Sequence, residues 1–134
     1  MAQYLLYTDG AARGNPGPAG AGAFICTLEG ESVAEIAEYL GETTNNVAEY
    51  QALLAGLKRL VELRAEAVEI RADSELMVRQ LQGKYRVKHP NLIPLYQAAQ
   101  TLLKKIPNHS IKHVRREENV EADRLANQAI DEHF

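Results

Sequence analysis

The sequence contains a single cysteine, Cys26, so no disulfide can form within the chain. Cys26 lies inside an apolar run and is expected to be a small core residue rather than a nucleophile. Chains that do without disulfides are typical of reducing compartments. We therefore expect a cytoplasmic protein.

Long apolar runs are also missing. No segment approaches the roughly 20 apolar residues of a membrane span, and Met1–Tyr7 lacks the basic start of a secretion signal. The 134 residues are 46% hydrophobic and 25% charged, which are ordinary values for a soluble domain. We expect one domain, residues 1–134, that acts as a monomer without a membrane or an obligate protein partner.

The sequence has no excess of basic residues: 15 Lys and Arg face 18 Asp and Glu, a net charge of −3. Taken alone, this balance argues mildly against a nucleic-acid partner, because such proteins usually carry a basic surface. The glycine-rich segment Gly10–Gly22 matches neither the P-loop nor the dinucleotide-binding glycine pattern. A nucleotide cofactor is therefore not expected.

The hydrophobic pattern predicts five strands and four helices. Strands are expected at Gln3–Thr8, Ala21–Leu28, Ser32–Leu40, Val68–Ala72 and Ile111–Val114, and helices at Val47–Leu63, Ser74–Leu81, Asn91–Ile106 and Asn119–Ile130. Gly10–Gly22 is expected to be a loop. The first three strands should be antiparallel, whereas the later strands are separated by helices and should be parallel. The predicted fold class is α/β, with a mixed five-stranded sheet flanked by helices.

Four acidic residues each have a simple structural explanation. Asp9 precedes a glycine, as in many turns, and Glu49 follows Asn46 at the spacing of a capping box. Asp73 lies where the N-cap of a helix is expected. Asp123 falls in the first turn of a helix, where the helix dipole favours negative charge. Considered singly, each acid fits its structural role.

Considered together, the same acids favour a site. Asp9 and Asp73 end two predicted strands, and the carboxyl ends of parallel neighbours meet at one edge of a sheet. Glu49 precedes an apolar position by one helical turn and should face the sheet. Converging carboxylates without an adjacent cation cannot all stay ionised, so their pKa values rise or metal ions bind. Carboxylate oxygens suit Mg²⁺ or Mn²⁺, and two such ions about 4 Å apart hydrolyse phosphodiesters.

Four sequence blocks carry these acids. The blocks are Tyr7-Thr8-Asp9-Gly10 with Gly14–Pro18, Thr43–Asn46 with Glu49, Ala72-Asp73-Ser74, and Glu118-Asn119 with Ala122-Asp123 and Leu125-Ala126. In this order they resemble the signature of the type 1 ribonuclease H family, and they span nearly the whole chain. One block alone would be a weak signal.

The resemblance implies a metal-dependent endonuclease that cuts the RNA strand of RNA–DNA hybrids and leaves 5′-phosphate and 3′-hydroxyl ends. It implies a catalytic quartet of Asp9, Glu49, Asp73 and Asp123, with Gly10 at the metal site, that binds two Mg²⁺ or Mn²⁺ ions. It places the following residues along the substrate path: Gly10, Asn15, Thr44, Asn45, Asn46, Ser74 and Asn119. The family reads the 2′-hydroxyl groups of RNA, and double-stranded RNA stays open as a second substrate.

Two departures from the family pattern point to its compact branch. The basic segment Lys84–His89 is shorter than the family's basic protrusion. Its Lys84, Arg86 and Lys88 are expected to contact phosphates, with a solvated loop as the alternative. The loop Arg115–Glu118 lacks the mobile histidine that many members carry before the last helix. Arg115, Arg116 or water alone would take its place.

Two other functions remain open at this point. A nuclease of the same fold can act on DNA, because fold alone does not define the substrate. A non-catalytic hybrid-binding module is the alternative from another class. Such a module would be expected to have lost at least one acid, and all four are present.

Overall fold

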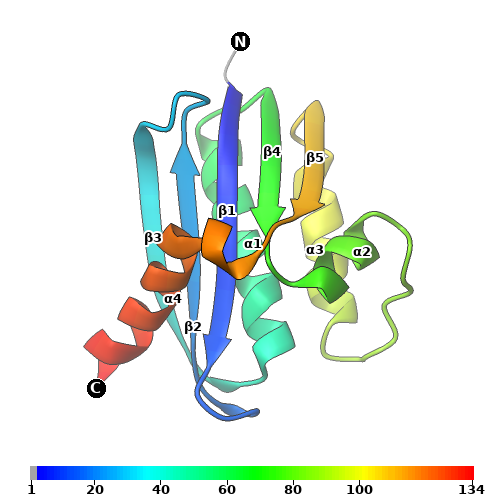
Figure 1. Cartoon of the computed structure of the whole chain (residues 1–134). Helices are drawn as coiled ribbons and strands as arrows, with labels where there is room; N and C mark the ends of the chain where they lie inside the picture. Colours follow the sequence, from blue (N-terminus) through cyan, green and yellow to red (C-terminus); the bar gives the residue numbers. More distant parts are fainter. Residues whose placement is uncertain (1–2) are drawn as a thin grey trace.

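Strand β1 (Gln3–Ala12) occupies the middle of a five-stranded sheet with the order β3-β2-β1-β4-β5. The computed structural model describes residues 3–134 (Figure 1). β2 (Gly17–Cys26) is antiparallel to β1, and β3 (Ser32–Thr43) is antiparallel to β2. On the other side, β4 (Ala67–Ala72) and β5 (Asn108–His113) continue the sheet in parallel with β1. The predicted mixed sheet is confirmed.

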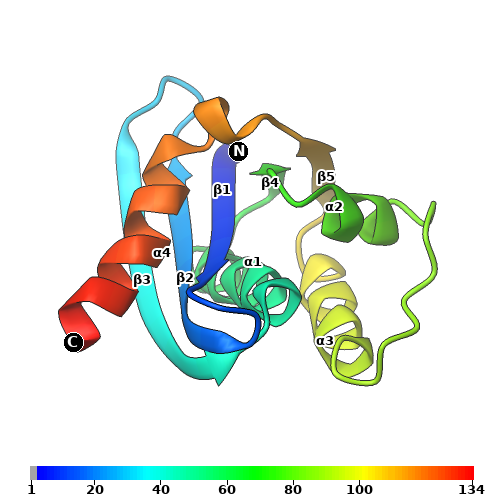
Figure 2. The same ribbon diagram turned by 60° about the horizontal axis from the view of Figure 1, so that its bottom comes forward.

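Helices lie on both faces of this sheet (Figures 1 and 2). α1 (Asn45–Glu62) packs on β1 and β2 and is joined on that face by α3 (Ile93–Leu103), whereas α4 (Val120–His133) crosses the opposite face. α2 (Glu75–Leu81) contacts β5, and a 3-10 turn, η1 (Arg116–Glu118), precedes α4. Within residues 3–134, no helix has both the length and the apolar character needed to cross a bilayer.

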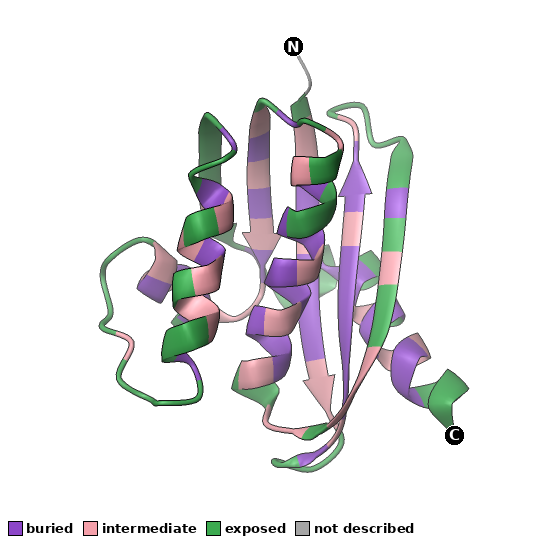
Figure 3. Cartoon of the chain, turned by 180° about the vertical axis from the view of Figure 1, so that it is seen from behind, coloured by how far each residue is buried: buried purple, intermediate pink, exposed green. Residues whose placement is uncertain are grey.

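The main core lies between α1 and the sheet. Leu53, Leu57 and Leu60 recur at helical spacing along α1 and are fully buried. They belong to the same apolar cluster as Leu6 of β1 and Ile70 of β4. Figure 3 shows this buried stripe along α1 and on the strands behind it. Because burying one leucine contributes about 1.5–3 kcal/mol, the stripe is enough to hold α1 in a defined register on the sheet.

The segment predicted as a loop, Gly10–Gly22, is mostly strand, so this prediction was wrong. β1 continues to Ala12 and β2 begins at Gly17. The reason is close helix packing: a Cβ at Gly22 would lie 2.2 Å from the Ala122 carbonyl oxygen of α4. A Cβ at Gly10 would lie 2.3 Å from the main chain of α1. These glycines allow helices to approach the strands and do not form turns.

Smaller differences concern element ends. β5 begins at Asn108 rather than Ile111, because its parallel ladder with β4 already starts where Asn108 pairs with Ala67. Leu28 lies beyond the end of β2, and its side chain is 54% exposed. α3 is shorter than predicted and has no side-chain cap at its start. The apolar pattern marked each element correctly, but hydrogen bonding between elements determined where each one ends.

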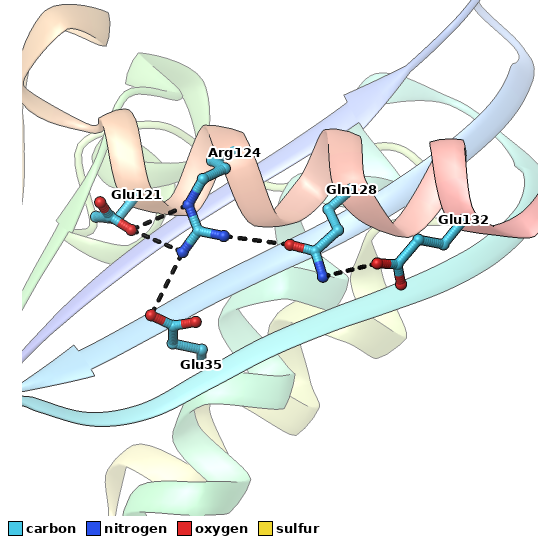
Figure 4. Close-up of polar contacts among 5 residues, drawn as sticks. All are labelled: Glu35, Glu121, Arg124, Gln128 and Glu132. Carbon is cyan, nitrogen blue, oxygen red and sulfur yellow. Dashed lines mark hydrogen bonds and ion pairs between the residues drawn. The ribbon is translucent and has the colours of Figure 1, made fainter.

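A polar network fastens the outer side of α4 to β3 (Figure 4). The Arg124 guanidinium lies 3.3 Å from a carboxylate oxygen of Glu35 on β3 and 2.8 Å from one of Glu121 on α4. It also donates to Gln128, which in turn donates to Glu132. Solvent screens exposed pairs of this kind, so each one stabilises the helix only weakly. The network matters because α4 carries Asp123, and its contacts help to set where that helix lies.

Candidate active site

Three carboxylates from distant parts of the chain meet at one edge of the sheet. Asp9 of β1, Glu49 of α1 and Asp73 after β4 each offer an oxygen within 4.8 Å of the other two. Parallel pairing of Thr8 with Ala72 places Asp9 beside Asp73. The sequence had suggested that Asp9 ends a strand, but Asp9 lies inside β1. The reason is that β1 continues along β2 after its pairing with β4 stops.

Main-chain and side-chain hydrogen bonds position these acids. The Gly10 amide donates to Glu49 Oε1 at 2.8 Å, so β1 holds the carboxylate that α1 presents. The Asp123 carboxylate of α4 raises the pKa of Asp9. The Asn127 amide donates to Asp123 Oδ1 at 3.3 Å, one turn further along α4. Asp123 thus borders the three clustered acids and is not one of the group within 4.8 Å.

The simple structural explanations fail for three of the four acids. Thr44, not Asn46, caps α1, so Glu49 takes no part in a capping box. Ser74 caps α2 by accepting from the Met77 amide at 3.3 Å, which leaves Asp73 without that role. Asp9 is buried within a strand rather than exposed at a turn. Asp123 does lie in the first turn of α4, so the helix-dipole explanation stands for it.

Burial and neighbouring carboxylates raise the pKa values of Asp9 and Glu49. Burial is the main cause that raises the pKa of Asp9 to about 10, and the charges of Glu49, Asp73 and Asp123 add to it. Burial and Asp73 raise the pKa of Glu49 to about 8, against the opposing effects of the Gly10 amide and of Arg116. Without cations, this cluster therefore holds protons at neutral pH. A cluster of this kind is a candidate functional site.

The acids line a hollow of about 680 Å³. Its rim carries three arginines and one histidine that the sequence had not assigned to a site or had left as alternatives: Arg13, Arg115, Arg116 and His113. Arg13 is also tied to α4 by a 2.7 Å ion pair with Asp131. These residues come from the β1–β2 connection, the end of β5 and η1, and no local motif links them. Only the fold brings them to one rim.

Some of the predicted substrate residues reach this hollow and others do not. Gly10, Asn45 and Ser74 line it. Asn15 does not, but its side chain accepts from the Asn45 amide at 3.0 Å and so supports that residue. Thr44 is the N-cap of α1, and Asn46 is exposed outside the hollow.

Asn119 is placed differently from the prediction. Its side chain is 0% exposed and donates from Nδ2 to the Thr8 carbonyl oxygen at 2.8 Å. A direct contact with substrate is therefore excluded, because the tight junction between β1 and α4 covers the side chain.

The basic segment lies away from the acids. Lys84, Arg86 and Lys88 are exposed in the connection between α2 and α3. Lys84 and Arg86 line a second hollow together with Tyr85 and Tyr96, and none of the four acids lines it. The fold therefore does not bring this segment into the acidic hollow.

Sequence comparisons give the chain clear relatives. The family described as "Reverse transcriptase-like" matches residues 7–129. "Bifunctional protein Rv2228c" of Mycobacterium tuberculosis is 45% identical over 128 residues, which are 95% of this chain and 35% of that protein. "Ribonuclease HI" of Halobacterium salinarum is 42% identical over 94% of this chain and 63% of its own length. "Ribonuclease H" of Clostridium botulinum is 32% identical over 98% of both. The chain thus spans about a third of the length of the Mycobacterium tuberculosis protein and just under two thirds of the length of the Halobacterium salinarum protein.

Solved structures agree with these relationships. The N-terminal RNase H domain of Rv2228c from Mycobacterium tuberculosis superposes with a TM-score of 0.96 at 43% identity, over 98% of this chain and 96% of that one. LC11-RNase H1, solved in complex with an RNA/DNA hybrid, superposes with a TM-score of 0.92 at 45% identity, over 97% of this chain and 98% of that one. The fold and much of the sequence are therefore shared with ribonucleases H.

Proposed function

Because the chain belongs to the ribonuclease H family, we propose that it is an endoribonuclease that hydrolyses the RNA strand of RNA–DNA hybrids. The observation that carries this proposal is the convergence of Asp9, Glu49 and Asp73, with Asp123 beside them, in one open hollow. A relative of 45% identity has been solved with an RNA/DNA hybrid, which supports the substrate class. The proposal includes a single-domain, monomeric and cytoplasmic enzyme.

The donor set fits two divalent ions. All its side-chain ligands are carboxylate oxygens, which suit Mg²⁺ or Mn²⁺ and not softer metals. The raised pKa values of Asp9 and Glu49 support the same view, because a divalent ion would replace the protons that these acids otherwise hold. We assign Asp9, Glu49, Asp73 and Asp123 as ligands, with Gly10 holding Glu49 in place through its amide.

The surrounding residues prepare the reaction. When bound, the ions would lower the pKa of an attacking water and stabilise the leaving 3′ oxygen, giving 5′-phosphate and 3′-hydroxyl products. Asn45 and Ser74 line the hollow and would present polar groups to the sugar and phosphate of the RNA strand. Gly10 lets α1 pack closely on β1, because its missing Cβ leaves room for the main chain of Ala48 and Glu49. The cations on the rim offset phosphate charge locally, which explains how a protein of net charge −3 can hold a polyanion.

Cleavage assays test this function directly. The full chain is incubated with end-labelled RNA–DNA hybrid, double-stranded RNA and DNA duplex of one sequence, each with Mg²⁺, Mn²⁺ or EDTA. The expected result is metal-dependent cutting of the hybrid's RNA strand, with 3′-hydroxyl ends that a polymerase extends. Cutting of the DNA duplex, or equal cutting in EDTA, would contradict the proposal.

A further inference from the structure

Asn119 forms an unusual junction between β1 and α4. It occupies the N-cap position of α4, where an asparagine side chain normally accepts from an amide of the first turn. Here the side chain makes no capping bond. It is directed at the strand instead, with Nδ2 2.8 Å from the Thr8 carbonyl oxygen. The residue has therefore exchanged a local cap for a contact with a strand 111 residues away in sequence.

Two of the hydrogen bonds of Asn119 end beside two of the four acids. The Thr8 carbonyl belongs to the peptide unit that joins Thr8 to Asp9. At its main chain, the Asn119 carbonyl oxygen accepts from the Asp123 amide at 3.1 Å. One buried residue thus connects the backbone of Asp9 with the backbone of Asp123. Buried hydrogen bonds of this kind fix the mutual orientation of the elements that they join.

We propose that Asn119 is a positioning residue that sets Asp123 against Asp9. This inference rests on the proposed function of these acids. Asn119 does not touch the substrate, since its side chain has no exposed surface. Its effect passes through the first turn of α4, and small displacements of a catalytic group lower the rate far more than they weaken binding.

Other contacts hold the rest of α4 in place without Asn119. The Ala126 carbonyl oxygen packs against Gly20 of β2, and the Arg124–Glu35 pair joins the helix to β3. Loss of the Asn119 side chain should therefore leave α4 on the sheet and loosen only its first turn. That expectation separates positioning from a general role in folding.

The test compares Asn119→Ala with the wild type and with Gln80→Met. Gln80 is also buried and also makes one buried side-chain hydrogen bond, with Tyr50 at 2.6 Å, but this bond joins α1 to α2. The readouts are kcat and KM on the hybrid, Mg²⁺ binding to the free protein by calorimetry, and hydrogen exchange of the amides of residues 120–124. Asn119→Ser, which is polar and smaller than asparagine, replaces the alanine variant if the latter does not fold.

For Asn119→Ala, kcat is expected to fall at least about tenfold while KM changes less than about twofold. Mg²⁺ binding should weaken, and the Asp123 amide should exchange faster while the C-terminal half of α4 is unchanged. Gln80→Met should lower the melting temperature to a similar degree and leave kcat close to that of the wild type. If both variants lose kcat alike, or if Asn119→Ala keeps it, Asn119 is only a packing residue.

The failure of this inference is distinguishable from failure of the proposed function. If the wild type does not cut the hybrid, the proposed function is wrong. The exchange and calorimetry experiments still test Asn119 in that case, because neither requires substrate. Unchanged exchange at Asp123 together with unchanged Mg²⁺ binding would overturn the positioning role.

Discussion

The acidic hollow and the basic segment differ in how the fold holds them. Asp9, Glu49 and Asp73 come from three separate elements, and two of them are at most 5% exposed. Lys84 and Arg86 lie close together in sequence, in one exposed connection between α2 and α3. The first region is built by tertiary packing, and the second is a property of one short stretch of chain.

This difference follows from what each region would do. Catalysis depends on groups that are held in place before the substrate arrives, and burial among packed elements provides that rigidity at the expense of raised pKa values. Attraction of a polyanion depends on charge within about a Debye length, roughly 8–10 Å, and tolerates mobile side chains. The two regions should therefore respond very differently to substitution.

The largest effect is expected from Asp73→Asn or Asp9→Asn. Either change removes a ligand while keeping its shape, so hybrid cleavage should fall by about a thousandfold or more. Gel assays on end-labelled hybrid measure this. Glu38→Gln, an exposed acid-to-amide change on β3, is the matched control and should keep full activity. Activity close to wild type in both Asp variants would show that the acidic hollow is not the active site.

The same variants should be more stable than the wild type without metal. Without metal, the folded site keeps Asp9 protonated at neutral pH although the unfolded chain releases that proton, and this difference lowers the free energy of unfolding. Asparagine has no proton to take up on folding and avoids this cost. Asp9→Asn should therefore raise the melting temperature in EDTA. Added Mg²⁺ should stabilise the wild type more than the variant, because it binds the folded site only. Lower melting temperatures for both variants in EDTA would mean that the acids stabilise the fold.

The metal-free wild type should lose stability as pH rises. The pKa values of Asp9 and Glu49 are raised to about 10 and about 8, so the folded state keeps protons that the unfolded chain releases near pH 4. The contribution of these two groups to the free energy of unfolding is therefore fully present below about pH 4. It falls as the pH rises toward about 8–10, by up to about 1.4 kcal/mol per pH unit for each group.

Urea unfolding in EDTA at several pH values above about 5 measures this slope. The range avoids Glu69, whose pKa is lowered by its hydrogen bond from Arg71 and whose contribution is lost only in more acidic solution. Asp9→Asn should show a flatter profile. A stability that is constant or rises between about pH 5 and 8 would contradict the raised pKa values.

A smaller effect is expected from replacing Lys84, Arg86 and Lys88 together with alanine. These exposed cations would contribute equally to binding of the substrate and of the transition state. Their loss should therefore raise KM by about three- to tenfold and change kcat little. Steady-state kinetics at two salt concentrations measure this, and added salt should narrow the difference. Replacing the exposed Lys58, Lys104 and Lys105 removes equal charge elsewhere and is the control. A collapse of kcat would contradict the assignment.

The smallest effect is expected from His113→Ala. His113 lies at the end of β5 on the rim of the acidic hollow, but it is exposed and sits at a strand position that does not match the family's mobile histidine. Its kcat should stay within about tenfold of the wild type. A loss of several hundredfold with the fold intact would show that His113 takes part in proton transfer.

The sequence by itself determined the fold class, the order of the elements and the identity of the acids. Apolar residues at helical spacing in 47–63 could only form a helix with one buried face, and that spacing placed Glu49 toward the sheet. The spacing of the four blocks around the acids was enough to indicate the family before any geometry was known. Apolar spacing and block spacing are properties of the sequence alone, so they can be recognised without knowing which residues are neighbours in space.

Only the tertiary structure decided which neighbours these residues have. Gly10 and Gly20 could not be recognised as strand residues, because their conformation depends on helices that pack on them from elsewhere in the chain. Asn119 could not be recognised as a buried link to Thr8 for the same reason. The rim also joins Arg13 of the β1–β2 connection with His113 and Arg116, about 100 residues later in the chain. Long-range packing sets burial and hydrogen-bond partners, and neither is encoded in the spacing of residues along one element.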